Sequence, residues 1–372
     1  MTPGLRLLLE TAHDAVGVAD GRIVAPTGSF DVVLRIPDGT LHPGLINAHD
    51  HLHRNHYGRL GTPPYANAYE WGRDIHRTHA DAIVRGRAMP RREALLRGAW
   101  KNLRAGVTTV VHHDAPEADV EAGFPIRVAR VASAHSLGFS AELPSVATGE
   151  PFAIHLAEGI DEASAAEVQA LAARGLVTHD LLAVHAVGVD DAGIAALRAA
   201  RAAIVWCPSS NHFLFGRTAP AALLAPGVDV MLGSDSLLTA DGTLLDELRL
   251  ARSLRLVSDE RLRDAVGAVA ARRIGVEPPS LALGARADVV VLRAPLLEAM
   301  ERDVAAVVAG GVLRVLDPAL AGALGTSAAL GRIEGRDGVA RWIGDQEPPF
   351  DDRARPRSTR AVMASRRAAR CP

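Results

Sequence analysis

The sequence predicts an α/β protein in which repeated strand–helix units surround a parallel sheet, with a small β-domain built from both ends of the chain. Through the middle of the chain, apolar strand-like runs alternate with helical stretches rich in Ala, Leu, Glu and Arg. β-Branched runs punctuated by Gly occur near residues 17–37 and return at 287–295 and 304–316. The 372 residues, 48% of them hydrophobic, suffice for such a globular architecture.

Seven strand-like segments are recognisable between the two β-rich ends. Each is a short apolar run, which is typical of a parallel strand buried on both faces. They lie at residues 44–48, 107–112, 126–131, 152–155, 181–185, 203–206 and 229–233. A closed parallel barrel has eight strands, so we expect the remaining one within residues 134–150.

Composition argues against several classes of protein. The formal net charge of −2 creates no overall field that would attract nucleic acid or an anionic membrane. No run of about 18 apolar residues predicts a transmembrane helix, and the apolar run near the N-terminus is too short to indicate a signal peptide. We therefore expect a cytoplasmic protein with neither a membrane nor a nucleic acid as partner.

The end of the chain differs from the rest. Residues 353–372 contain seven arginines and no acidic residue, a composition that cannot bury enough apolar surface to fold alone. We expect residues 333–372 to form a disordered, Arg-rich tail. The alternative is a nucleic-acid-binding arm, which truncation after residue 352 would test.

Two histidines follow the first barrel-type run. His49 and His51 are two residues apart, so both imidazoles of an extended chain point to one side and can meet one divalent ion. His53 continues the same period, so the spacing alone leaves open which pair binds. Only two cysteines are present, Cys207 and Cys371, and a metal would have to be held by histidine and carboxylate.

Further His and acidic residues lie where other apolar runs end. His155 ends one run with Glu158 three residues later, His185 ends another, and Asp235 follows a third. Each taken alone could be a buried core histidine or a helix-capping aspartate. In a parallel α/β barrel, however, the carboxyl ends of all strands meet at one mouth, so the set together predicts a metal site.

These residues belong to motifs by which the chain resembles the amidohydrolase superfamily, in its cytosine-deaminase-like and chlorohydrolase-like branch. The resemblance runs from about residue 16 to 316. The motifs occur in order and are PGLINAHDH (43–51), AGVTTVVHH (105–113), IHLAEG (154–159), VHAVGVD (184–190), CPSSN (207–211), GVDVMLGSDS (227–236) and SLALGARADVVVL (280–292).

The resemblance implies a distorted (β/α)8 TIM-type barrel at residues 43–277 and a small β-sandwich formed by residues 1–42 and 278–320. It also implies one divalent metal ion per chain, Zn or Fe. Its ligands would be His49, His51, His155 and Asp235, with His53 a neighbour.

The chain has a single lysine, Lys101, beside forty arginines. Members of the superfamily with two metals commonly bridge them by a carboxylated lysine on the fourth strand. Lys101 lies in a helical stretch before the second strand, so we expect a solvated helix charge and a single metal.

Three residues are expected to handle protons at this site. A divalent ion such as Zn lowers the pKa of bound water to about 7. Asp235 can accept the proton of that water, and Glu158 can act as the general acid/base that protonates a ring nitrogen and then the leaving group. His185 would polarise the attacked carbon or orient the water.

Candidate substrate-binding residues lie in the segment that follows the first strand. The segment at residues 53–79 has the composition of a long loop suited to a planar polar substrate, and a surface-loop role is the equal alternative for each of its candidates. The candidates are Arg54, His56, Trp71 and Arg73, together with His113 at the end of the second strand.

About 42 residues separate His113 from His155, which is short for two strand–helix units. We therefore expect abridged third and fourth units, a more open pocket and a possible homodimer in which the partner supplies a wall.

The function predicted is hydrolysis of a C–N bond in a small cyclic or heteroaromatic substrate, as in a deaminase that uses metal-activated water. Hydrolytic ring opening of a cyclic amide or imidazolone, or displacement of another leaving group, is the alternative within the enzymes. A non-catalytic barrel scaffold is the alternative of another class.

Overall fold

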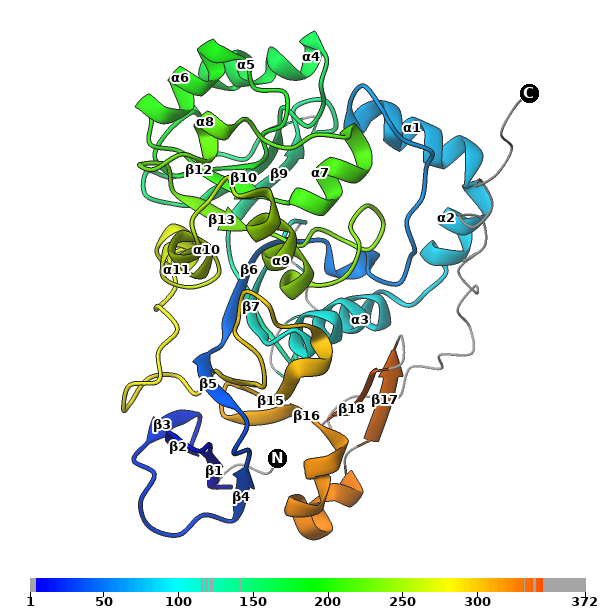
Figure 1. The fold of residues 1–372 in the computed structure, drawn as a ribbon. Helices are drawn as coiled ribbons and strands as arrows, with labels where there is room; N and C mark the ends of the chain where they lie inside the picture. The colour runs from blue at the N-terminus through cyan, green and yellow to red at the C-terminus, as the bar shows by residue number, and fades with distance from the viewer. Residues whose placement is uncertain are drawn as a thin grey trace, which may run out of the picture.

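Figure 1 shows a barrel of strands and helices joined to an antiparallel β-structure that contains strands from both ends of the chain. The computed structural model describes residues 5–114, 117, 120, 123–140, 142–330, 332–336 and 339–343. No helix in this described part of the chain has the length and apolar composition needed to cross a membrane.

Parallel strands form the barrel wall in two ladders, β6–β7–β8 and β9–β10–β11–β12–β13. The strands are β6 (Leu45–Asp50), β7 (Val107–His112), β8 (Arg127–Ala129), β9 (Ala132–Ser136), β10 (Phe152–Leu156), β11 (Leu181–His185), β12 (Ala203–Trp206) and β13 (Val230–Leu232). The N–H of Asp235, just after β13, donates to the carbonyl of His49 in β6 at 3.0 Å and so links the two ladders.

The third and fourth strands, β8 and β9, form one bent strand. Only Arg130 and Val131 separate them, while β8 pairs with β7 and β9 pairs with β10. A parallel crossover needs about a dozen or more residues, so β8 and β9 run end to end and no helix lies between them. The strand expected within residues 134–150 thus lies earlier and continues the run at 126–131. The predicted distorted (β/α)8 barrel is confirmed, and this merger is its main distortion.

Helices cover the outside of the barrel. They include α3 (Arg91–Arg104), α4 (Glu162–Ala165), α5 (Glu167–Ala172), α6 (Asp191–Ala199), α8 (Ala221–Leu224), α9 (Leu244–Leu254), α10 (Asp259–Ala265) and α11 (Ala268–Arg273). Side-chain caps start several of them directly after the loops at the strand ends. At α6, Asp190 accepts the N–H of Gly193 at 2.7 Å, and at α9, Asp246 accepts the N–H of Thr243 at 2.7 Å.

A helical insertion follows β6, where the sequence suggests a loop. It contains η1 (Leu52–Arg54), α1 (Ala68–Thr78) and α2 (Ala80–Arg87), and in Figure 1 α1 lies near α7 (Pro208–Phe215). Ile75 of α1 and Ile83 of α2 pack against Leu238, which follows β13. The insertion is therefore anchored beside the loop that carries Asp235.

Two mostly antiparallel sheets from both ends of the chain form the β-structure, in which Leu7–Glu10 and Val32–Arg35 are a parallel pair. One contains β1 (Leu7–Glu10), β2 (Ala15–Ala19), β3 (Arg22–Val24) and β4 (Val32–Arg35), and the other contains β5 (Thr40–Pro43), β14 (Val289–Leu292), β15 (Val304–Ala309), β16 (Val312–Leu316), β17 (Arg332–Arg336) and β18 (Val339–Ile343). The β5–β14 pairing joins the two chain ends, and one apolar cluster contains residues from both. The second sheet extends beyond the expected boundary at residue 320 and into the segment 333–372 expected to be disordered. Residues 344–372 of the predicted tail lie outside the described residues.

Helix α3 lies between the barrel and this β-structure. It contacts η1 and β7 on one side and β15 and β16 on the other. Residues 94–104 of the helix are therefore all buried. At Gly98, an added Cβ would come 2.3 Å from the carbonyl oxygen of Leu52, so the helix directly supports the segment that follows His51.

We predict that Gly98→Ala destabilises the protein. Alanine in a helix interior normally stabilises by about 0.5–1 kcal/mol relative to glycine, but here the methyl group would collide with the backbone of η1, and overpacking typically costs about 1–3 kcal/mol. The free energy of unfolding in urea should therefore fall. Gly58→Ala is the control, because nothing lies within 4 Å of its added Cβ. Equal unfolding free energies for the two variants would contradict the prediction.

Candidate active site

The predicted metal-ligating residues meet at the mouth of the barrel, where the parallel strands terminate at their carboxyl ends. His49 and His51 come from β6, His155 from β10, His185 from β11, and Asp235 directly follows β13. The ligand atoms of one subset, His49, His51 and Asp235, all lie within 4.8 Å of one another, as do those of His49, His155 and His185. The barrel thus brings residues up to 186 positions apart into one cluster.

The spacing within the cluster matches the needs of a metal ion. His51 Nε2 is 3.3 Å from His155 Nε2, and His155 Nε2 is 3.4 Å from His49 Nε2. His49 Nε2 is 3.7 Å from Asp235 Oδ1. Two nitrogens that share a tetrahedral zinc at about 2.0–2.1 Å lie about 3.3–3.4 Å apart. These four side chains can therefore hold one divalent ion.

Hydrogen bonds on the outer ring nitrogens favour the tautomer that metal binding requires. The outer nitrogen of His155, Nδ1, is 2.5 Å from the carbonyl oxygen of His135, and that of His51 is 3.5 Å from Asp114 Oδ2. A hydrogen on each Nδ1 leaves the lone pair of Nε2 directed at the cluster. Burial also lowers the pKa of His49, His51 and His155 well below the usual value, because the imidazolium form is penalised.

The carboxylate of Asp235 is firmly oriented. Its Oδ2 accepts hydrogen bonds from Ser210 Oγ at 2.7 Å and Thr239 Oγ1 at 2.8 Å, and its Oδ1 accepts the N–H of Ser236 at 2.7 Å. Oδ1 is also the oxygen that faces His49. Ser210 lies in the CPSSN motif, which is the signal that could have identified it from sequence, whereas Thr239 has no such signal.

Left-handed backbone conformations occur where strands end at the site. The φ angle is 51° at Ala157, 68° at His185 and 48° at Asp235. Such a conformation costs a non-glycine residue about 1–2 kcal/mol. In β11, Leu182 and Val184 face the barrel interior, so strict alternation would direct His185 away from it. The left-handed turn changes this direction, and His185 Nε2 lies 3.5 Å from Glu158 Oε1.

Glu158 and His185 form the second half of the site. His185 Nδ1 is 2.8 Å from Asn211 Oδ1, and the Asn211 amide nitrogen donates to Thr218 Oγ1 at 3.3 Å, which fixes the direction of that amide. The Glu158 side chain is 13% exposed, and burial raises its pKa to about 7, with a smaller opposing effect of His185. A carboxyl group with such a pKa can both donate and accept a proton near neutral pH.

The backbone around Glu158 is held by residues that sequence reasoning missed. Glu167 accepts the N–H of Ala157 at 2.7 Å with one oxygen and the hydroxyl of Tyr69 at 2.5 Å with the other. The N–H of Ala68 donates to the carbonyl of Glu158 at 2.9 Å. The start of α1 therefore anchors the loop that presents Glu158.

The predicted substrate-binding residues are placed differently from one another. His113 lies in the cluster, with its ring 4.2 Å from that of His155, and its Nε2 is 2.8 Å from the carbonyl oxygen of Ala134. His56 instead bonds to the carbonyl of Gly86 at 3.1 Å.

The other three lie in the insertion after β6. The indole N–H of Trp71 donates to the carbonyl of Leu60 at 2.9 Å, so the polar atom of this side chain is hydrogen-bonded within the insertion. Arg73 is exposed on α1. Arg54 is partly buried on η1, where its Nε donates to His53 Nε2 at 3.4 Å.

A second group, His53, His112 and Asp114, lies beside the first. His53 Nδ1 is 3.2 Å from Asp114 Oδ2. The far nitrogen of each ring already accepts a hydrogen, His53 Nε2 from Arg54 and His112 Nδ1 from the N–H of Leu52 at 3.3 Å. In neutral rings the near nitrogens therefore carry the hydrogens, and they suit the carboxylate of Asp114 rather than a cation.

Lys101 is not the solvated helix charge expected from sequence. The side chain is 1% exposed, and its Nζ lies 3.1 Å from Asp50 Oδ2 and donates to the carbonyl of Asp235 at 2.7 Å. The expectation is wrong because Lys101 lies on the face of α3 that packs against the barrel, where Asp50 and the carbonyl of Asp235 take up its charge.

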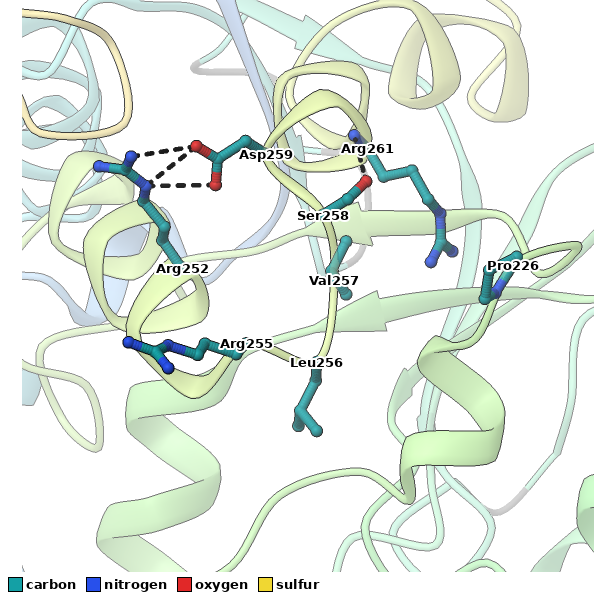
Figure 2. A pocket seen from close by; sticks show the side chains of 8 residues that line it. All are labelled: Pro226, Arg252, Arg255, Leu256, Val257, Ser258, Asp259 and Arg261. Carbon is teal, nitrogen blue, oxygen red and sulfur yellow. Dashed lines mark hydrogen bonds and ion pairs between the residues drawn. The ribbon is translucent and has the colours of Figure 1, made fainter.

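A hollow of about 380 Å³ lies away from the histidines, around the start of α10 (Figure 2). Two of its three arginines are engaged: Arg252 pairs with Asp259 at 3.0 Å, and Arg261 donates to the carbonyls of Leu224 at 2.6 Å and Val228 at 2.8 Å. None of the predicted site residues lines this hollow.

No protein-family model and no curated protein matches the sequence. Solved structures do match the fold. An adenosine deaminase from Xanthomonas campestris with bound zinc is 20% identical, with a TM-score of 0.65, over 84% of this chain and 93% of that one. Atrazine chlorohydrolase from Arthrobacter aurescens, complexed with zinc and atraton, is 19% identical with a TM-score of 0.60, over 82% and 94% of the two chains.

N-isopropylammelide isopropylaminohydrolase from Burkholderia multivorans is 21% identical with a TM-score of 0.55, over 83% of this chain and 98% of that one. All three similarities extend over nearly the whole length of the matched proteins. The chain therefore shares the fold of these deaminases and hydrolases, in agreement with the barrel that the resemblance of its motifs implies.

Proposed function

We propose that the protein is a metal-dependent hydrolase that cleaves a C–N bond in a small cyclic or heteroaromatic substrate, most simply a deaminase. The observation that carries the proposal is the convergence of three imidazoles beside Asp235, with the Nε2 atoms of His51 and His49 lying 3.3 Å and 3.4 Å from that of His155. The adjacent Glu158, whose pKa is raised to about 7 by burial, adds a group able to move protons. The similar structures are those of deaminases and hydrolases, two of them with zinc.

The ion in this proposal is held by His49, His51, His155 and Asp235, with one ion per chain, Zn or Fe. When bound, such an ion lowers the pKa of a coordinated water to about 7. His185 is assigned to the site but outside the ligand set, because the four protein ligands and the attacking water together already fill the five positions to which a catalytic zinc can expand.

The chain's own residues then handle the protons. Asp235, held by Ser210 and Thr239, accepts a proton from the attacking water. Glu158 delivers a proton to a ring nitrogen of the substrate, recovers one that the water has given up by way of Asp235, and passes it to the leaving amino group, which departs as ammonia; the second proton of the water restores Glu158 as the product carbonyl forms. His185, oriented by Asn211, polarises the attacked carbon or hydrogen-bonds the water. His113, beside His155, and Arg54, the cation nearest in sequence to the ligating histidines, are assigned to substrate contact.

A direct test is release of ammonia by the metal-loaded protein from a panel of purines, pyrimidines, pterins, triazines and imidazolones. The proposal expects ammonia from at least one aromatic amine. A product with an opened ring, or with another group displaced, would favour the alternative chemistries on the same site. A protein that holds no metal and turns over nothing would favour a non-catalytic barrel. The cytoplasmic location and the homodimer stay predictions.

We predict that the purified protein carries close to one divalent ion per chain. His51→Ala should lose the ion because it removes a ligand, whereas His185→Ala should retain it and lose turnover, by about 3 kcal/mol of transition-state stabilisation if it resembles removal of one oxyanion donor. Elemental analysis of the three proteins is the measurement. Two ions per wild-type chain, or loss of the ion in His185→Ala, would contradict the assignment.

We predict that Glu158→Gln keeps the metal but loses most of the turnover. The change preserves the shape of the side chain and removes its titrating proton, and general acid/base groups typically contribute about 10² to 10⁴ in rate. In the wild-type protein kcat should change with pH as the Glu158 carboxyl titrates, and in the variant this change should be absent. Measuring kcat from pH 5 to 9 for both proteins, with about equal metal content, checks this. Near-wild-type turnover would exclude Glu158 as the proton shuttle.

A further inference from the structure

Lys101 lies buried directly behind two of the proposed ligand segments. Its side chain is 1% exposed, and its Nζ is within 3.1 Å of Asp50, the residue between His49 and His51. The same Nζ donates to the carbonyl of Asp235 at 2.7 Å. A buried ammonium is strongly unfavourable unless it is paired and hydrogen-bonded, so the charge of Lys101 needs a negatively charged partner and hydrogen-bond acceptors.

Asp50 provides that compensation within a satisfied polar network. Its side chain is fully buried and faces α3. Oδ1 accepts from Asn55 Nδ2 at 2.7 Å, and Oδ2 accepts from Asn102 Nδ2 at 2.7 Å in addition to the contact with Lys101. Ser234 Oγ lies 3.3 Å from the same oxygen. The pair therefore connects helix α3, strand β6 and the loop after β13.

The backbone of Asp235 is the part of the site that needs such support. The residue is left-handed, with a φ of 48°. Its N–H donates to the carbonyl of His49 at 3.0 Å, and its own carbonyl accepts from Lys101. Because the N–H and the carbonyl of Asp235 are both hydrogen-bonded, its carboxylate is kept pointing toward His49, at the junction between β13 and β6.

We propose that Lys101 is a positioning residue: by bonding to Asp50 and to the carbonyl of Asp235, it holds the Asp235 carboxylate in the orientation that binds the metal. The inference rests on the proposed function, because it assumes that Asp235 is a metal ligand. Lys101 acts through Asp235 and touches neither substrate nor metal.

The experiment separates this role from simple charge neutralisation. Lys101→Met leaves Asp50 as an uncompensated buried charge and is expected to be unstable. The double variant Lys101→Met, Asp50→Asn removes both charges while keeping similar shapes, so its stability in urea should recover toward that of the wild type. The carbonyl of Asp235 still lacks the ammonium donor at 2.7 Å and keeps the longer bond from Ser234 Oγ at 3.2 Å. The double variant should therefore bind zinc about 10–100-fold more weakly, the usual effect of losing a supporting contact behind a ligand.

Zinc affinity is measured by competition with a chromophoric chelator, and ligand geometry by the visible absorption of the cobalt(II)-substituted protein. The matched control is Arg104→Met, which removes another buried cation on α3, one that pairs with Glu301 at 3.2 Å. It should lower stability without changing zinc affinity or the cobalt spectrum.

Weaker zinc binding and an altered cobalt spectrum in the double variant, with the control unchanged, support the proposal. Wild-type zinc affinity and an unchanged spectrum in the double variant overturn it while leaving the proposed function intact. An equal loss of affinity in Arg104→Met also overturns it, because the effect would then be general destabilisation. A wild-type protein that binds no zinc or cobalt contradicts the proposed function itself and removes the inference with it.

Discussion

The site depends on three buried imidazoles that converge on one point, with the Nε2 atoms of His51 and His49 lying 3.3 Å and 3.4 Å from that of His155. Burial lowers the pKa of His49, His51 and His155, so it favours the neutral rings that can bind a cation. The barrel must therefore fix the direction in which these rings point. It does so with acceptors behind the rings, the carbonyl of His135 and the carboxylate of Asp114.

The ends of the strands carry the strain that this geometry requires. Ala157, His185 and Asp235 all have a left-handed backbone conformation. Each of them forms a hydrogen bond with a residue of another element. Glu167 holds Ala157, Asn211 holds His185, and Lys101 holds Asp235. Contacts with neighbouring elements thus offset the cost of placing each side chain at the mouth.

The two carboxylic acids of the site differ through their surroundings. Asp235 accepts hydrogen bonds from two hydroxyls and one N–H and faces His49, as suits an ionised ligand. Glu158 is buried near His185, and its pKa is raised to about 7, as suits a group that exchanges protons. The same functional group can therefore take two roles within one mouth.

The sequence by itself determined the α/β barrel, the β-structure from both chain ends and the cluster of His49, His51, His155, His185 and Asp235, because periodicity and strand-end position are local signals that converge in a parallel barrel. Only the tertiary structure decided that β8 and β9 merge, that Glu167 and Tyr69 hold the loop of Glu158, and that Lys101 is buried. Those features depend on which element covers which face. The partners of Lys101 come from β6 and from the loop after β13, the latter more than 130 residues beyond the helix, so no pattern within α3 could predict that its lysine lies under the site.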